Sequence, residues 1–163
     1  MQHLMETWKN YIAEIQAEES KIVSFDFDDT LALGDSKYRY IGPNKPLLSL
    51  FKQFKDKGFD VYIVTSRSKA NEDKYREDAN QMAVDEFVAE HGLSPDGIFF
   101  THPHDKVHTL REHGVILHFD DDEFELGAID QLAPEIGTVR INFEDGSIMS
   151  GQEHIDKLLG ETK

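Results

Sequence analysis

The sequence predicts an α/β fold, a Rossmann-like three-layer sandwich in which helices cover both faces of a central parallel sheet of five strands. Two patterns support this prediction. Short apolar runs rich in β-branched and aromatic residues alternate along the chain with segments whose apolar residues recur at helical spacing. Alternation of strands and helices favours parallel pairing, with right-handed crossovers between successive strands.

The patterns assign a residue range to each element. Strands are expected at residues 21–25, 60–64, 97–101, 115–119 and 138–143. Helices are expected at residues 3–19, 47–54, 71–91, 106–113 and 125–133, and glycines stand where three of them would be capped. Residues 31–46, after the first strand, are predicted to be a loop rich in Gly, Asp, Tyr and Pro.

Turn and capping signals organise the C-terminal part. Asp145-Gly146 predicts a turn, so residues 147–149 are expected to pair back onto the fifth strand. Ser150 and Glu153 have the spacing of a capping box, which predicts a last helix. We therefore expect one domain over residues 1–163, with a helix at 3–19, a core at 21–143 and a hairpin and helix at 145–160.

Composition limits the function classes. Lys and Arg total 17 against 32 Asp and Glu, so the formal net charge is -15, which disfavours long nucleic acid and anionic membrane surfaces as partners. The chain has no cysteine, which excludes disulfides and thiolate metal sites. Residues 1–19 lack the apolar region of a signal peptide, and no apolar stretch is long enough to span a bilayer. A cytoplasmic location is therefore expected.

Polar and charged residues gather where the predicted strands end or the next helix begins. They are Asp26, Asp28, Thr30, Thr65, Ser66, Arg67, Lys106, Asp120, Asp121 and Asp122. The carboxyl ends of parallel strands share one edge of the sheet, and ligands of such sheets bind beyond that edge. Packing alone does not explain carboxylates after a core strand, because they are rarely buried unless paired or bound to a metal.

These residue types suit phosphoryl chemistry. A carboxylate can attack phosphorus, and a second carboxyl group can protonate the leaving oxygen and later activate water. Mg²⁺ prefers oxygen ligands and offsets the repulsion between carboxylates and phosphate. A hydroxyl and a lysine can hold the remaining phosphoryl oxygens.

Four segments resemble the motifs of the haloacid dehalogenase superfamily, specifically of its phosphatases. The run Asp26-Phe27-Asp28-Asp29-Thr30-Leu31 resembles the DxDxT signature, and Val61-Tyr62-Ile63-Val64-Thr65 resembles the second motif. Lys106 matches the lysine of the third motif, and His118-Phe119-Asp120-Asp121 resembles the fourth. The motifs occur in the family's order and cover residues 22–122.

The resemblance implies a role for each matching residue. Asp26 would be the nucleophile and a Mg²⁺ ligand, and Asp28 the general acid and base, with its backbone carbonyl on the metal. Thr65 and Lys106 would hold the phosphoryl group, with Ser66 beside them. Asp121 would be the acidic metal ligand, with Asp120 next to it, although the run of three aspartates leaves this register open.

The resemblance also implies a substrate class. An acid at Asp28 is typical of the branch that hydrolyses phosphate monoesters. Neither interval between motifs has room for a folded cap domain, as in the phosphatase domain of polynucleotide kinase-phosphatases. We expect a nucleotide or another small phosphate ester, with a 3′-phosphatase on polynucleotide ends or a phosphoprotein phosphatase as alternatives. A cap supplied by a neighbouring subunit makes a homo-oligomer a candidate assembly.

Alternative interpretations accompany these assignments. A phosphoacceptor receiver domain and a non-catalytic Mg²⁺- or phosphate-binding module are the two alternatives from other classes. Asp29 is expected to be solvated or to cap a helix, whereas Arg67, Tyr38 and Arg39 are candidate substrate contacts. The histidines near Lys106 (His102, His104 and His108) and His118 are expected to be surface or supporting residues rather than zinc ligands.

Overall fold

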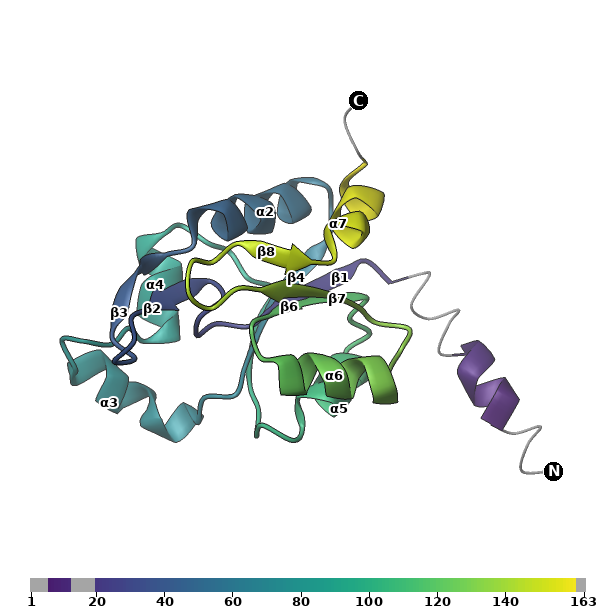
Figure 1. Ribbon diagram of the computed structural model, residues 1–163, viewed down its shortest axis with the longest axis horizontal. Coiled ribbons are helices and arrows are strands. Elements are labelled where there is room, and N and C mark those ends of the chain that lie inside the picture. The colour runs from purple at the N-terminus through teal and green to yellow at the C-terminus, as the bar shows by residue number, and fades with distance from the viewer. Residues whose placement is uncertain (1–5, 13–19, 161–163) are drawn as a thin grey trace.

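The computed structural model describes residues 6–12 and 20–160, and its centre is a six-stranded sheet (Figure 1). The spatial order is β5-β4-β1-β6-β7-β8. Five strands are parallel and the last is antiparallel: β1 (Ile22–Phe25), β4 (Asp60–Thr65), β5 (Gly97–Phe100), β6 (Leu117–Asp120), β7 (Gly137–Ile141) and β8 (Ile148–Ser150). The predicted parallel sheet and the C-terminal hairpin are both confirmed.

Helices cover both faces of this sheet (Figure 1). One face packs against α2 (Lys45–Asp56), α4 (Val84–Glu90) and α7 (Gln152–Leu159). The other packs against α5 (Lys106–Glu112) and α6 (Glu123–Leu132). Residues 6–12 are helical, and the rest of the predicted N-terminal helix lies outside the described residues. Within the described residues, no helix has both the length and the apolar character that crossing a bilayer requires.

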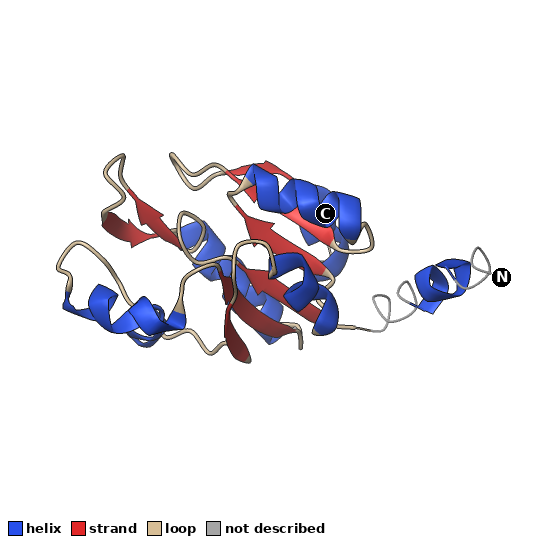
Figure 2. Cartoon of the chain, turned by 90° about the horizontal axis from the view of Figure 1, so that it is seen from below, coloured by secondary structure: helices blue, strands red, loops and turns tan. Residues whose placement is uncertain are grey.

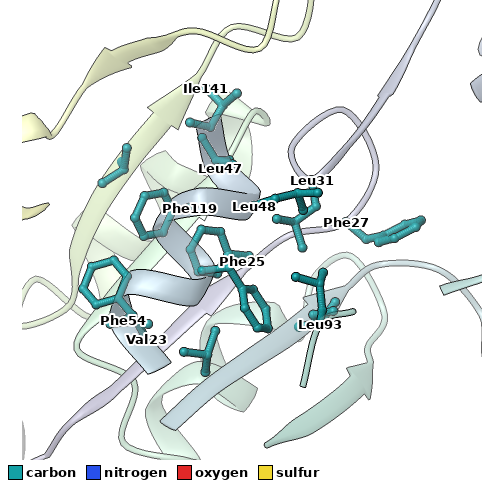
Figure 3. Packing of buried hydrophobic residues seen from close by; sticks show 14 of the residues in the cluster. Val23, Phe25, Phe27, Leu31, Leu47, Leu48, Phe54, Leu93, Phe119 and Ile141 are labelled. Atoms are coloured by element: carbon teal, nitrogen blue, oxygen red, sulfur yellow. The ribbon is translucent and has the colours of Figure 1, made fainter. Parts of the chain in front are cut away.

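Alternation along the strands separates the two cores. In β1, Val23 and Phe25 belong to the cluster beneath α2, and the Phe25 ring stacks on Phe119 at a centroid distance of 4.2 Å (Figure 3). Ser24 points to the opposite face, as expected for a two-residue period. It is fully buried there and bonds to His118. One face is therefore almost entirely apolar, whereas the face beneath α5 and α6 carries polar residues that lead to the strand ends.

The strand order fixes where a ligand can bind. Counting only the five parallel strands along the chain, the spatial order is 3-2-1-4-5. The order reverses between β1 and β6, so the crevice of this sheet opens beyond Phe25 and Asp120. A receiver domain has the order 2-1-3-4-5 instead, as flavodoxin-like folds do. The topology therefore contradicts the receiver-domain alternative.

Residues 31–46, expected to be a loop, contain a two-stranded antiparallel hairpin of β2 (Ala32–Gly34) and β3 (Tyr40–Pro43). The hairpin and α3 (Glu72–Glu77) project from the same end of the sheet (Figures 1 and 2). Its tip is held by an Asp35 side chain that accepts bonds from the Lys37 and Arg39 backbone amides. Local side-chain hydrogen bonds of this kind leave no regular spacing of apolar residues in the sequence. The apolar pattern alone therefore did not indicate this hairpin.

The single helix predicted at residues 71–91 is wrong. A 3₁₀ turn (Lys69–Asn71) and α3 precede an irregular stretch at residues 78–83, and α4 follows. The Asp78 side chain accepts a bond from the Asn80 amide, and the Asn80 carbonyl accepts one from the Tyr40 amide. The backbone here binds the hairpin instead of continuing the helix. The capping box at Ser150 is also wrong, because the N-cap is Gly151 and no side chain bonds to the helix start.

Candidate active site

The strand ends bring the acidic motifs together at the crevice between β1 and β6. Phe25 pairs with Phe119 in the parallel register, so Asp26 and Asp120 leave the sheet side by side. The Asp26 amide donates to the Phe119 carbonyl at 2.8 Å, which fixes the turn out of β1. Both carboxyl groups are buried. The sequence expectation that these motifs share one edge is therefore met in space.

Lys106 lies at the centre of this group, and its side chain is almost completely buried. Its ammonium group donates to Asp26 at 3.1 Å and to Asp120 at 2.9 Å, and it forms an ion pair with Glu125. Burial favours the neutral amine, but the three carboxylates outweigh it and raise the pKa of Lys106 well above its usual value. The lysine is therefore a fixed cation between the ends of β1 and β6.

Asp120 is held by partners on both sides. It accepts from Lys106 and from His118 Nε2, which lies 2.8 Å away, while the Ser24 hydroxyl bonds to His118 Nδ1 at 2.7 Å. Burial works to raise the pKa of Asp120, but Lys106 and His118 lower it well below its usual range. Burial also lowers the pKa of His118, which favours a neutral ring. Asp120 is thus a permanently charged group whose oxygens are largely committed.

Three carboxylates can approach one cation. Asp26, Asp120 and Asp121 each offer an oxygen, and these oxygens lie within 4.8 Å of one another. The Thr30 hydroxyl is within hydrogen-bonding reach of Asp26, at 3.4 Å, and of Asp121, at 3.3 Å. Burial and the charge of Asp120 raise the pKa of Asp26 well above its usual value and the pKa of Asp121 to about 7. The uncompensated negative charge and the all-oxygen donor set fit a hard divalent cation.

Thr65 and Ser66 stand opposite this carboxylate group, at the end of β4. They line a cavity of about 210 Å³ together with Asp26, Lys106 and the acidic run after β6. Thr65 is buried and its hydroxyl accepts from the Arg67 amide, whereas the Ser66 hydroxyl donates to Glu125 at 2.8 Å. The predicted phosphate-binding residues therefore share one cavity with the predicted nucleophile.

Asp28 takes a different direction from Asp26. Its carboxylate receives two bonds of 2.8 Å from the Arg67 guanidinium and is about half exposed. Its side chain is not part of the three-carboxylate group, which is compatible with the expected use of its backbone carbonyl. Asp28 lines the cavity of Asp26 and also a neighbouring one. It therefore stands at the border between two spaces.

Arg67 is buried and makes four side-chain hydrogen bonds within the protein, which the sequence did not indicate. Besides Asp28, it donates to Glu72 at 3.0 Å and to the Met82 carbonyl at 2.7 Å. Its guanidinium lies over the rings of Phe27 and Tyr75, at 4.7 and 4.1 Å from the centroids. The side chain ties the strand end to α3 and to the irregular stretch before α4. Four of its five N–H groups face protein acceptors, and its expected role as a substrate contact stays a prediction.

The other expectations have mixed outcomes. Tyr38 is 82% exposed at the hairpin turn and lines the neighbouring cavity, whereas Arg39 is paired with Asp35 and lines neither cavity. Asp29 is half-buried in a turn with φ of 59°, so it is neither fully solvated nor a helix cap, and it lines both cavities. The side chains of His102, His104 and His108 are exposed, and no metal-ligand group in the described residues includes a histidine.

Sequence reasoning missed Glu125. This glutamate is buried, contacts Lys106 and accepts from Ser66. It stands in the first turn of α6, where acids are ordinary because they suit the helix dipole. One signal was available: the helix starts at Glu123 behind an Asp122 cap, so Glu125 lies close to the end of β6.

No family model and no curated protein matches the sequence. The structure of a 3-deoxy-D-manno-octulosonate 8-phosphate phosphatase from Moraxella catarrhalis, with magnesium, phosphate and the sugar acid, has a TM-score of 0.50 at 19% identity, covering 90% of each chain. The cobalt-bound deoxy-D-mannose-octulosonate 8-phosphate phosphatase of Haemophilus influenzae has a TM-score of 0.50 at 15% identity, covering 88% of this chain and 90% of the other.

The chain has the fold of these two phosphatases. Both matches cover nine-tenths of the other chain, so the two proteins carry no large additional domain outside the match. The prediction of an α/β fold with a central, mostly parallel sheet is therefore confirmed. The likeness to polynucleotide kinase-phosphatases gains no support from these comparisons.

Proposed function

We propose that the protein is a Mg²⁺-dependent phosphomonoester hydrolase that forms an aspartyl-phosphate on Asp26. One observation carries this proposal: a buried carboxylate at the topological switch point shares a cavity with a buried ammonium group and two hydroxyl-bearing residues. The Asp26 oxygen lies 3.1 Å from Lys106 Nζ, so negative charge that develops on a phosphoryl group at Asp26 has a fixed cation beside it. The structure of the Moraxella catarrhalis phosphatase, which contains magnesium and phosphate, gives independent support.

The position of each residue in the cavity suits one step of phosphoryl transfer. Asp26 attacks phosphorus, and the phosphoryl group passes from the substrate oxygen to its carboxylate. Lys106 and Thr65 hold phosphoryl oxygens, with Ser66 at the edge of the same cavity. Water then attacks the aspartyl-phosphate and releases inorganic phosphate. These contacts act by position and charge, which are the main sources of rate in phosphoryl transfer.

Asp26 and Asp121 would hold the Mg²⁺ ion, with Asp120 beside them. Asp121 is the better ligand of the two neighbours because both Lys106 and His118 already occupy Asp120. A Mg²⁺ ion held there would offset the charge of the phosphate and help to orient the phosphoryl group. Thr30 keeps Asp26 and Asp121 together when it bridges them.

Asp28 would act as general acid and then as general base. It lies two residues beyond the nucleophile, at the border of the cavity, where the leaving oxygen must emerge. Arg67 orients its carboxylate through two bonds. We infer a small phosphate ester as the substrate, because the formal net charge of -15 disfavours long nucleic acid. A phosphorylated polynucleotide end or phosphoprotein is the second candidate, because the intervals between the motifs leave no room for a folded cap domain over the site.

The test is hydrolysis of an aryl phosphate with and without Mg²⁺. We expect Mg²⁺-dependent turnover that Asp26→Asn abolishes, with a loss of at least about a thousandfold in kcat. Asp73→Asn, a change of the same kind at an exposed residue of α3, serves as the control. Unchanged turnover in Asp26→Asn would refute the assignment of the nucleophile. Binding of phosphate without turnover of any ester would support the non-catalytic module instead.

A further inference from the structure

A second cavity adjoins the acidic one and has no role in the steps above. It measures about 220 Å³ and lies between the β2–β3 hairpin and α3, and we call it the hairpin cavity. Asp28 and Asp29 line both cavities, so the two spaces meet at these residues. The rest of its wall consists of Tyr38, Tyr40, Tyr75, Arg67 and Gln81, together with the small and apolar residues of β2.

We propose that the hairpin cavity receives the leaving group of the substrate and selects a neutral, ring-sized alcohol over one that carries a second anionic group. This inference rests on the proposed hydrolysis. A general acid must touch the oxygen that departs. Asp28 stands where the two cavities meet, so a phosphoryl group at Asp26 directs its ester oxygen toward Asp28 and its alcohol into the hairpin cavity.

The size of the hairpin cavity limits what it can hold. A protein cavity of about 150 Å³ holds a benzene ring, whereas pockets for drug-sized ligands begin at about 300 Å³. At about 220 Å³ the hairpin cavity fits one six-membered ring with a small substituent. Tyr38, Tyr40 and Tyr75 offer ring surfaces and hydroxyl groups, which suit both an aryl alcohol and a sugar.

The charges in the hairpin cavity disfavour a leaving group that carries a second anionic group. The charged residues that line the hairpin cavity are Asp28, Asp29 and Arg67. Arg67 is the single cation among them, and four of its five N–H groups already face Asp28, Glu72 and a backbone carbonyl. A carboxylate on the leaving group would therefore meet Asp29, while the one cation in the wall is already paired with two carboxylates. The structural neighbours are named for the phosphate ester of a sugar acid, so the inference separates this chain from them.

A matched pair of esters tests the selection. The amide of para-carbamoylphenyl phosphate has nearly the shape of the carboxylate of para-carboxyphenyl phosphate but no charge. We expect kcat/KM to be at least about tenfold higher for the amide, which corresponds to about 1.4 kcal/mol. Equal values for the two esters would overturn the inference while leaving the hydrolase proposal intact. Failure to hydrolyse either ester, or any other, would overturn both.

Substitutions then locate the selection in the hairpin cavity. Gln81→Lys places a cation in its wall, and we expect the ratio of kcat/KM values to move about fivefold toward the carboxylated ester. Gln53→Lys makes the same change on α2, outside the cavity, and should leave the ratio unchanged. Tyr38→Ala should raise KM more for the carbamoylphenyl ester than for acetyl phosphate. If Gln81→Lys and Gln53→Lys give the same ratio of kcat/KM values for the two esters, this cavity does not contact the leaving group.

Discussion

Replacing Asp121 by asparagine should stabilise the metal-free protein and abolish its response to Mg²⁺. Burial and Asp120 raise the pKa of Asp121 from 3.8 to about 7, so its carboxylate is unfavourable in the folded state at neutral pH. The folded protein keeps this proton up to about pH 7, whereas the unfolded chain loses it near its ordinary pKa. The contribution of Asp121 therefore lowers the free energy of unfolding as pH rises between these two values.

The size of the effect follows from the shift. Three pKa units correspond to about 4 kcal/mol, and solvent screening of this partly exposed group reduces the expected gain to about 1–2 kcal/mol. Mg²⁺ at about ten times its dissociation constant should add about 1.4 kcal/mol to the wild-type protein. For a chain of this length each kcal/mol moves Tm by about 2–4 °C.

The assay is thermal unfolding of wild type and Asp121→Asn, in a chelator and in Mg²⁺, at about pH 5 and about pH 8. We expect the variant to be more stable than wild type in chelator at the higher pH, with a much smaller difference at the lower pH. Glu144→Gln removes one exposed charge elsewhere and serves as the control. A variant that is less stable in chelator at the higher pH and still responds fully to Mg²⁺ would refute the reasoning.

Three further changes test the supporting structure. Arg67→Met should lower the free energy of unfolding measured in urea by about 3–5 kcal/mol, because Glu72 is left buried without its cation. Adding Glu72→Gln should restore part of this loss. Full stability of Arg67→Met would contradict the buried network. Gly151→Ala should lower the free energy of unfolding by more than about 2 kcal/mol, since φ is 94° and a Cβ would meet the Thr138 carbonyl. Gly127 has open space around it, so Gly127→Ala should raise the same free energy by about 0.5–1 kcal/mol. Lys106→Met should lower kcat/KM on an aryl phosphate at least about a hundredfold, because the cation beside Asp26 is lost, and an unchanged rate would exclude this role.

The strand ends could be predicted from the sequence because a parallel sheet forces them to one edge. A buried strand such as residues 22–25 is readable from its apolar run, and the residue that follows it is then placed by topology alone. The side-by-side position of Asp26 and Asp120 needs only the parallel order and the register of the two strands. Local pattern and global fold agree here, so the prediction succeeded.

The walls around this edge could not be predicted in the same way. Glu125 is an ordinary helix residue until α6 is docked beside α5, which brings it to Lys106. The hairpin of residues 32–43 is held by backbone and side-chain bonds within the turn and by the stretch at 78–83. These contacts have no periodicity, and they become visible only when segments distant in sequence are placed together.

The broken helix and the engaged arginine have one explanation. A continuous helix over residues 71–91 would have its backbone carbonyls bonded internally, and the Met82 carbonyl would not be free to accept from Arg67. The break also leaves the Val84 amide to donate to Glu72, the residue that holds the other side of the same guanidinium. Arg67 thus connects α3 and the irregular stretch at residues 78–83 to Asp28, and an altered contact at either would reach the proposed general acid through this one side chain. The irregular backbone therefore supports the site, because the Met82 carbonyl holds Arg67 directly and the Val84 amide holds it through Glu72.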